Sequence, residues 1–139
     1  KVLTDFGVEF ETRIISAHRT PVAAMEFASK AEENGIEVII AAAGKAAHLG
    51  GVLAAFTPMP VIGLPVKSST LTGLDSLLSI VQMPKGVPVA TVAIDGAENA
   101  GILAVQMLSL KYPELRQAMK DYKAKMEREV MAIDAEFQK

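Results

Sequence analysis

The chain has 139 residues, enough for one domain with a substantial hydrophobic core. Half of the residues are hydrophobic, and the formal net charge of −2 gives no indication of binding to nucleic acid or to an anionic membrane. The absence of cysteine excludes disulfides and thiolate metal sites and fits a reducing cytoplasm, while two histidines are too few for a typical zinc site. Residues 46–66 carry no charge, but glycines and prolines interrupt them, so we interpret them as buried core rather than as a membrane span.

The first residues predict the end of a helix followed by a strand. Residues 1–6 have a helical pattern, and Gly7 stands where a left-handed cap would close the helix. Polar and apolar residues alternate at the start of the segment 9–15, and its last residues are apolar, which is typical of a strand entering a sheet.

The segment Ser-Ala-His-Arg-Thr-Pro, residues 16–21, is the most informative part of the chain. Thr20 can cap the following helix and Pro21 can occupy its first turn, so His18 and Arg19 are expected at the carboxyl end of a strand, where α/β enzymes place their chemistry. A lone histidine is more often structural, but a hydroxyl, an imidazole and a guanidinium side by side favour a functional site.

Strands and helices alternate in the next part of the chain. We expect strands at residues 38–40, 61–66 and 89–94; helices at residues 21–34, 74–81 and 99–110; a turn with a short helix at 44–51; and a loop at 57–60. Apolar strands that alternate with helices predict an α/β domain, with a parallel sheet covered by helices on both faces.

The C-terminal segment, residues 111–139, is rich in charge and has the pattern of one long amphipathic helix. Its apolar stripe consists of Leu115, Met119, Tyr122, Met126, Val130, Ile133 and Phe137. The stripe would suit either its own domain or a neighbouring subunit. We therefore divide the chain into an α/β domain, residues 1–110, and a C-terminal helix, residues 111–139.

Three segments together resemble a known family. Residues 16–21, the run Ala-Ala-His-Leu at 46–49 and the segment from Asp75 to Pro84 are similar, in the same order, to signatures of the N5-carboxyaminoimidazole ribonucleotide mutase family of purine biosynthesis, also called the catalytic subunit of phosphoribosylaminoimidazole carboxylase. The resemblance implies a three-layer, flavodoxin-like fold. It also implies that residues 1–110 form a nucleotide-binding catalytic domain and that the helix at residues 111–139 packs on a neighbouring subunit.

One part of the family pattern is missing from this sequence. The family begins with a strand and a Gly-Ser-x-Ser-Asp turn that helps to bind the phosphate and ribose, and residues 1–6 do not supply them. In a flavodoxin-like sheet of order 2-1-3-4-5 the first strand lies between two others, and its loss would leave buried backbone groups unpaired at about 1–3 kcal/mol each. We therefore expect the sequence to be a fragment of a longer native chain.

The resemblance also implies a reaction. The family moves a carboxylate from the exocyclic nitrogen of an aminoimidazole ribonucleotide to C4 of its ring, through release and recapture of carbon dioxide and without a cofactor or metal. It implies His18 as the general acid and base, because imidazole exchanges protons readily near neutral pH. The implied substrate-binding residues are Ser16, Ala17, Arg19, Ala43, Gly44, Lys45, Ala46, Ala47, His48 and Leu49.

Within this set the resemblance implies different roles. Ser16 and Arg19 would hold the phosphate, although Arg19 could instead form a surface salt bridge. His48 would position the carboxylate or carbon dioxide, or could be structural. The loop 44–49, which apart from Lys45 carries no Asp, Glu, Lys or Arg, would help to enclose the site so that carbon dioxide does not escape. Residues 76–84 would close it from a neighbouring subunit. The family also implies a cytoplasmic homo-octamer.

The sequence departs from the family at three places. In the loop Gly-Gly-Ala-Ala-His-Leu-Pro-Gly, Lys45 replaces the second glycine and Gly50 replaces the proline, and residues 95–99 are a shortened loop. If that glycine has a positive φ, Lys45 costs about 1–2 kcal/mol in backbone strain; alternatively, its charge assists binding of the carboxylate.

Two other functions remain open at this point. One is a related lyase that carboxylates aminoimidazole ribonucleotide directly with carbon dioxide, although the loop of that enzyme usually lacks the Ala-Ala-His-Leu run. The other is a non-catalytic nucleotide-binding or assembly protein, because of Lys45 and the missing first unit. A dinucleotide-binding domain is disfavoured, since no Gly-x-Gly-x-x-Gly follows a strand.

Overall fold

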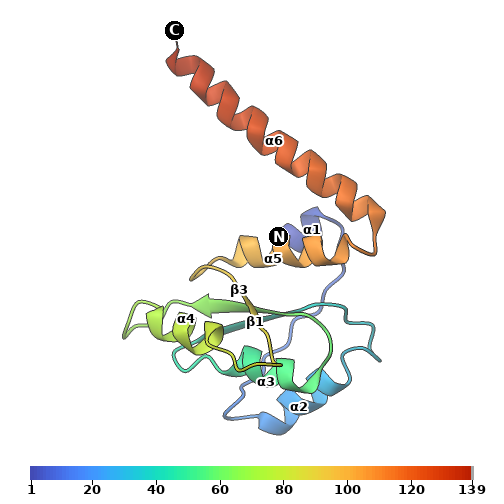
Figure 1. Cartoon of the computed structure of the whole chain (residues 1–139), viewed down its shortest axis with the longest axis vertical. Helices are drawn as coiled ribbons and strands as arrows, with labels where there is room; N and C mark the ends of the chain where they lie inside the picture. The colour runs from blue at the N-terminus through green and yellow to red at the C-terminus, as the bar shows by residue number, and fades with distance from the viewer. Residues whose placement is uncertain (139) are drawn as a thin grey trace.

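The structure is a computed structural model that describes residues 1–138 (Figure 1). In chain order its elements are α1 (Val2–Asp5), α2 (Pro21–Ser29), β1 (Ile39–Gly44), α3 (Leu49–Phe56), β2 (Val61–Val66), α4 (Leu74–Val81), β3 (Ala90–Thr91), α5 (Ala97–Leu108) and α6 (Pro113–Phe137). No helix in this part of the chain combines the length and apolar character needed to cross a membrane.

The centre of the fold is a parallel sheet. Within residues 1–138 it has three strands in the order β1-β2-β3, and β1 pairs with β2 over six residues, from Ile39 opposite Val61 to Gly44 opposite Val66. β3 is short and pairs through Ala90 and Thr91. The strand β2 is buried over its first five residues because it has neighbours on both edges and on both faces.

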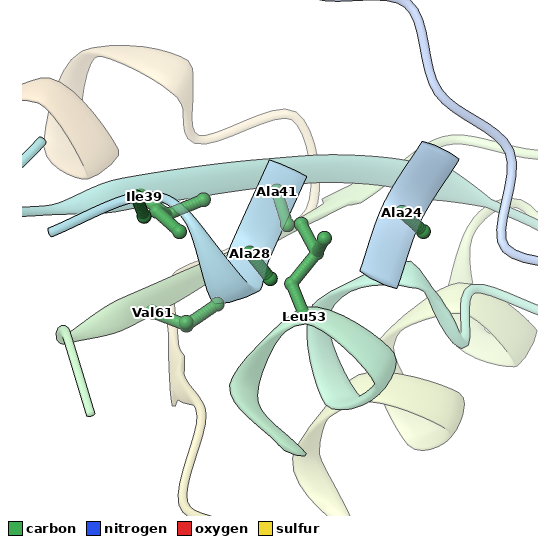
Figure 2. Packing of buried hydrophobic residues seen from close by; sticks show 7 residues of the cluster. Ala24, Ala28, Ile39, Ala41, Leu53 and Val61 are labelled. Atoms are coloured by element: carbon green, nitrogen blue, oxygen red, sulfur yellow. The ribbon is translucent and has the colours of Figure 1, made fainter. Parts of the chain in front are cut away.

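Helices α2 and α3 cover one face of the sheet (Figure 2). Ala24 and Ala28 of α2 are completely buried against Leu53 of α3 and Ile39 of β1. Because alanine has only a methyl group, α2 approaches α3 closely, and the larger Leu53 of α3 fills the space between α2 and the sheet.

Helices α1 and α5 cover the opposite face. Ala100 and Ala104 of α5 pack with Ile62 of β2, and Leu3 of α1 packs against this cluster. The two cores lie on opposite sides of the sheet because successive strand residues point to opposite faces. The predicted three-layer, flavodoxin-like α/β fold is therefore confirmed.

Helix α4 packs closely on β2. A Cβ atom on Gly63 would collide with the side chain of Ile80, so the glycine permits this close approach. At the end of β2, the buried hydroxyl of Ser76 donates a hydrogen bond to the carbonyl oxygen of Val66 at 2.9 Å. These contacts fix α4 beside the carboxyl ends of the strands.

The C-terminal helix α6 extends away from the body of the molecule (Figure 1). Only the first part of its apolar stripe packs on this chain: Leu115 and Met119 are buried against α5, and Tyr122 makes an edge contact with Phe6. The distal stripe residues are exposed, with Val130 at 67% and Phe137 at 85%.

The strand predicted at residues 9–15 is wrong. Residues 8–16 have no regular secondary structure, and Ile14 is fully exposed. A strand exists only through hydrogen bonds to a neighbour, and within residues 1–138 β1 pairs with β2 alone. The alternation of the sequence fits a strand, but the segment has no pairing partner in this sheet.

Several element boundaries also differ from the predictions. The helix expected at 21–34 ends as an α-helix at Ser29, although Gly35 closes the following turns with φ +75°. The strand expected at 38–40 extends to Gly44, and the third strand is shorter than the predicted 89–94. The helix expected at 99–110 is shifted, spanning Ala97–Leu108.

The short helix expected within 44–51 is α3, which continues to Phe56. Gly50 lies inside it, where an ideal Cβ would be in ordinary van der Waals contact with Cγ1 of Val89 at 3.5 Å. The predicted bounds of β2 and α4 and the left-handed Gly7, with φ +68°, are confirmed.

Candidate active site

The two histidines of the chain meet at the carboxyl ends of the strands. His18 lies in the turn before α2 and His48 at the N-cap of α3, and His18 Nε2 is 3.0 Å from His48 Nδ1. Their rings are nearly perpendicular, at 77°, with centroids 5.0 Å apart. Both side chains are exposed, so a ligand can reach them from solvent.

The contact between the imidazoles has a chemical consequence. A hydrogen bond between two ring nitrogens needs one N–H and one lone pair, and a doubly protonated pair would place two N–H groups against each other. One ring therefore donates its N–H across the contact and the other accepts it. Such a pair can give up or accept a proton while His48 keeps the ring of His18 in place.

The turn that carries His18 is held by local hydrogen bonds. The hydroxyl of Thr20 donates to the carbonyl oxygen of Ser16 at 3.0 Å and accepts from the Ser16 amide at 2.9 Å. Thr20 stands at the N-cap of α2, but its side chain closes this turn instead of capping the helix, which corrects the expected capping bond. Pro21 begins the helix as predicted.

Ser16 and Arg19, the two predicted phosphate-binding residues, contact each other. The Ser16 hydroxyl accepts from the backbone amide of Arg19 at 3.2 Å and lies 3.4 Å from its Nε. Among residues 1–138 the ion pairs are Lys1–Asp5, Lys111–Glu37 and Lys125–Glu129, so Arg19 does not form the surface salt bridge considered as its alternative.

The second part of the site is the segment from the end of β1 to the start of α3. Ala43 and Gly44 belong to β1, and Ala47 is buried and anchors the loop in the core. The amide of His48 donates to the carbonyl of Ala46 at 2.9 Å, which holds the turn before α3. Burial of Ala47 between two exposed residues directs His48 outward.

Lys45 has a positive φ, the condition under which the sequence predicts backbone strain at this position. Its φ is +56°, in the left-handed region, where an L-residue costs about 1–2 kcal/mol relative to glycine. Its carbonyl oxygen lies 3.5 Å from the hydroxyl of Ser79 in α4, and that hydroxyl donates to the backbone carbonyl oxygen of Asp75 at 2.6 Å. Ser79 was not among the predicted site residues, and only its place in the segment 75–84 connected it with the site.

The site is open in a single chain. Gly44, Lys45, Ala46 and His48 are exposed, as are His18 and Arg19 across from them. The loop 44–49 therefore does not enclose the site within this chain, contrary to the expectation from its largely apolar sequence. Within residues 1–138 no group of three or more His, Cys, Asp or Glu side chains could hold a metal ion.

Comparisons with known proteins identify the family of the chain. The family model described as AIR carboxylase matches residues 1–129. N5-carboxyaminoimidazole ribonucleotide mutase of Thermotoga maritima is 62% identical over 131 residues, covering 94% of this chain and 77% of that protein. The protein of the same name from Pyrococcus abyssi is 64% identical over 128 residues, covering 92% of this chain and 74% of its own.

Other relatives differ in name or in sequence distance. Phosphoribosylaminoimidazole carboxylase of Candida glabrata is 56% identical over 99% of this chain but only 24% of its own length. The crystal structure of Treponema denticola PurE superposes with a TM-score of 0.87 at 26% identity and covers 99% of this chain and 86% of that one. By the family match and by these identities, the chain belongs to the AIR carboxylase family.

Proposed function

We propose that this chain interconverts N5-carboxyaminoimidazole ribonucleotide and 4-carboxyaminoimidazole ribonucleotide in purine biosynthesis, as an isomerase. The observation that carries the proposal is the contact between His18 and His48 in a chain more than 60% identical to proteins named as this mutase. The substrate is a small anionic nucleotide, which fits the exposed cationic groups of the site.

His18 is the general acid and base of this reaction. It donates a proton when carbon dioxide leaves the exocyclic nitrogen, and it removes the C4 proton after carbon dioxide has bonded to the ring. Both steps use one group, because the proton given up in the first is recovered in the second. His48 accepts or donates the hydrogen bond that orients His18, and it positions the carboxylate or carbon dioxide.

Ser16 and Arg19 bind the phosphate. The hydroxyl and the guanidinium already face each other, so both can donate to one phosphate group. The remaining proposed substrate contacts lie on the two loops and are Ala17, Ala43, Gly44, Lys45, Ala46, Ala47 and Leu49. The reaction needs neither metal nor cofactor in this proposal, because the substrate itself carries the group that moves.

A homo-oligomer completes the site. Carbon dioxide must be kept from solvent, and the site is open in one chain, so a neighbouring copy supplies its cover. Two exposed apolar faces support this assembly: the distal α6 stripe and the face of α4 formed by Leu74, Leu78 and Val81. We propose a cytoplasmic octamer, in line with the resemblance, in which residues 76–84 contact the neighbouring site.

The experiment that tests the function is turnover of both carboxylated nucleotides, followed with and without added bicarbonate. The mutase interconverts them without a need for bicarbonate. The related carboxylase would instead convert aminoimidazole ribonucleotide only when carbon dioxide is supplied and would not use the N5-carboxy compound. Nucleotide binding without any turnover would support the non-catalytic reading.

A further inference from the structure

Lys45 occupies a backbone position that glycine would occupy without strain. Its φ of +56° places it among the few non-glycine residues of the described chain with positive φ, together with Thr72 and Asp95. The conformation costs about 1–2 kcal/mol, and such strain is typically retained where the residue has a function.

The charge of Lys45 is not used to stabilise the fold by pairing. Lys45 is exposed, and none of the three ion pairs found in residues 1–138 involves it. It is also the only Asp, Glu, Lys or Arg in residues 38–66, the segment that supplies both β1 and β2. The ammonium group of Lys45 is therefore available to a partner from outside the described chain.

The position of Lys45 indicates what that partner is. Lys45 directly follows β1 and is three residues before His48, which contacts His18. Ligands of open α/β sheets bind at these carboxyl ends of the strands. Ser16 and Arg19 lie on the other loop and bind the phosphate in the proposed function, so the carboxylate that reacts at His18 lies toward the loop of His48 and Lys45.

We propose that Lys45 is a specificity-determining residue whose ammonium group binds the carboxylate of the substrate. The inference rests on the proposed function of the site and assigns one further contact within it. It explains why a lysine persists where the backbone favours glycine: the charged contact with the ligand offsets the strain.

Three variants separate charge from backbone strain. Lys45→Ala removes the charge and keeps an L-residue at positive φ, Lys45→Gly removes both, and Lys45→Arg keeps both. Dissociation constants are measured by calorimetry for 4-carboxyaminoimidazole ribonucleotide and for aminoimidazole ribonucleotide, which has the phosphate but lacks the carboxylate. Turnover of each variant is measured in parallel.

The carboxylated nucleotide is expected to bind about tenfold more weakly to Lys45→Ala and to Lys45→Gly, the effect of one charge-assisted hydrogen bond. Lys45→Arg is expected to stay within about threefold, and aminoimidazole ribonucleotide to change by less than about twofold in all three. Equal losses for both nucleotides would assign Lys45 to the phosphate and overturn the proposal, as would unchanged binding in Lys45→Ala. Absence of turnover by the wild-type protein would contradict the proposed function. The ratio of the two dissociation constants would still test whether Lys45 binds the carboxylate.

Discussion

His18 Nε2 lies 3.0 Å from His48 Nδ1, although 30 positions separate the two residues in the sequence. The turn before α2 brings one imidazole to this point and the N-cap of α3 brings the other. Because a hydrogen bond between the two ring nitrogens contains one N–H, the tautomer of one ring determines the tautomer of the other.

Replacement of His48 tests whether this contact orients His18. His48→Ala removes the partner of Nε2, and we expect kcat to fall about 10- to 100-fold, the worth of a hydrogen bond to a charged group. His48→Asn is the matched control, because its amide oxygen can stand near the position of Nδ1, and it is expected to retain more activity than His48→Ala. Equal activity of His48→Ala and the wild type would contradict the role, and thermal melts check that both variants fold.

Lys45→Gly is expected to stabilise the fold. Glycine adopts φ +56° without a Cβ clash, so the free energy of unfolding should rise by about 1 kcal/mol after the entropy of glycine in the unfolded chain is subtracted. Urea unfolding of Lys45→Gly and Lys45→Ala measures this, because alanine keeps the strain and loses the same charge. Equal midpoints for the two variants would show that the backbone at this position is not strained.

The ion pair between Glu37 and Lys111 predicts a dependence of stability on pH. Hydrogen bonds from Lys111 and from the Tyr112 hydroxyl, at 2.5 and 2.7 Å, hold the pKa of Glu37 below its usual value of 4.5. The folded protein therefore binds this proton less readily than the unfolded chain, so the stabilisation is present above pH 4.5 and is lost as the pH falls through the lowered pKa.

Glu37→Gln removes this titration and is expected to lower the melting temperature at pH 7. The difference between wild type and variant should shrink as the pH is lowered toward 3. A difference that stays constant from pH 7 to pH 3 would contradict the assignment.

The exposed half of α6 predicts an intersubunit contact. Val130→Asp places a charge in the distal stripe, and we expect it to reduce the mass of the assembly measured by light scattering. Ala135→Asp is the matched control, since it adds the same charge to the same exposed helix on the side away from the stripe. An unchanged mass for Val130→Asp would remove α6 from the interface.

The elements predicted correctly are those whose sequence signal is local. Val61–Val66 is a continuous apolar run preceded by Pro60, and Leu74–Val81 repeats its apolar residues with helical spacing, so the bounds of both elements agree with the structure. Residues 9–15 also have a strand pattern, but strand formation needs a neighbour, and that information is not contained in the segment itself.

The sequence indicated the residues of the candidate site but not how they are arranged. The residues next to His18 indicated a functional turn, and the glycine expected by resemblance at position 45 made a positive φ a definite alternative. The contact of His18 with His48 depends on how α2 and α3 pack against β1, which no local pattern specifies. Ser79 could not be singled out, because its proximity to Lys45 arises only when α4 docks on the sheet.

The most direct test of the central claim is the decrease in ultraviolet absorbance as 4-carboxyaminoimidazole ribonucleotide is consumed, measured for the wild type and for His18→Asn. We expect turnover by the wild type and a loss of about 10²- to 10⁴-fold in His18→Asn, the range for removal of a general acid and base. Because His18 is exposed, the variant should melt at the same temperature as the wild type. Comparable turnover by a folded His18→Asn variant would contradict the assignment of His18 and with it the proposed mechanism.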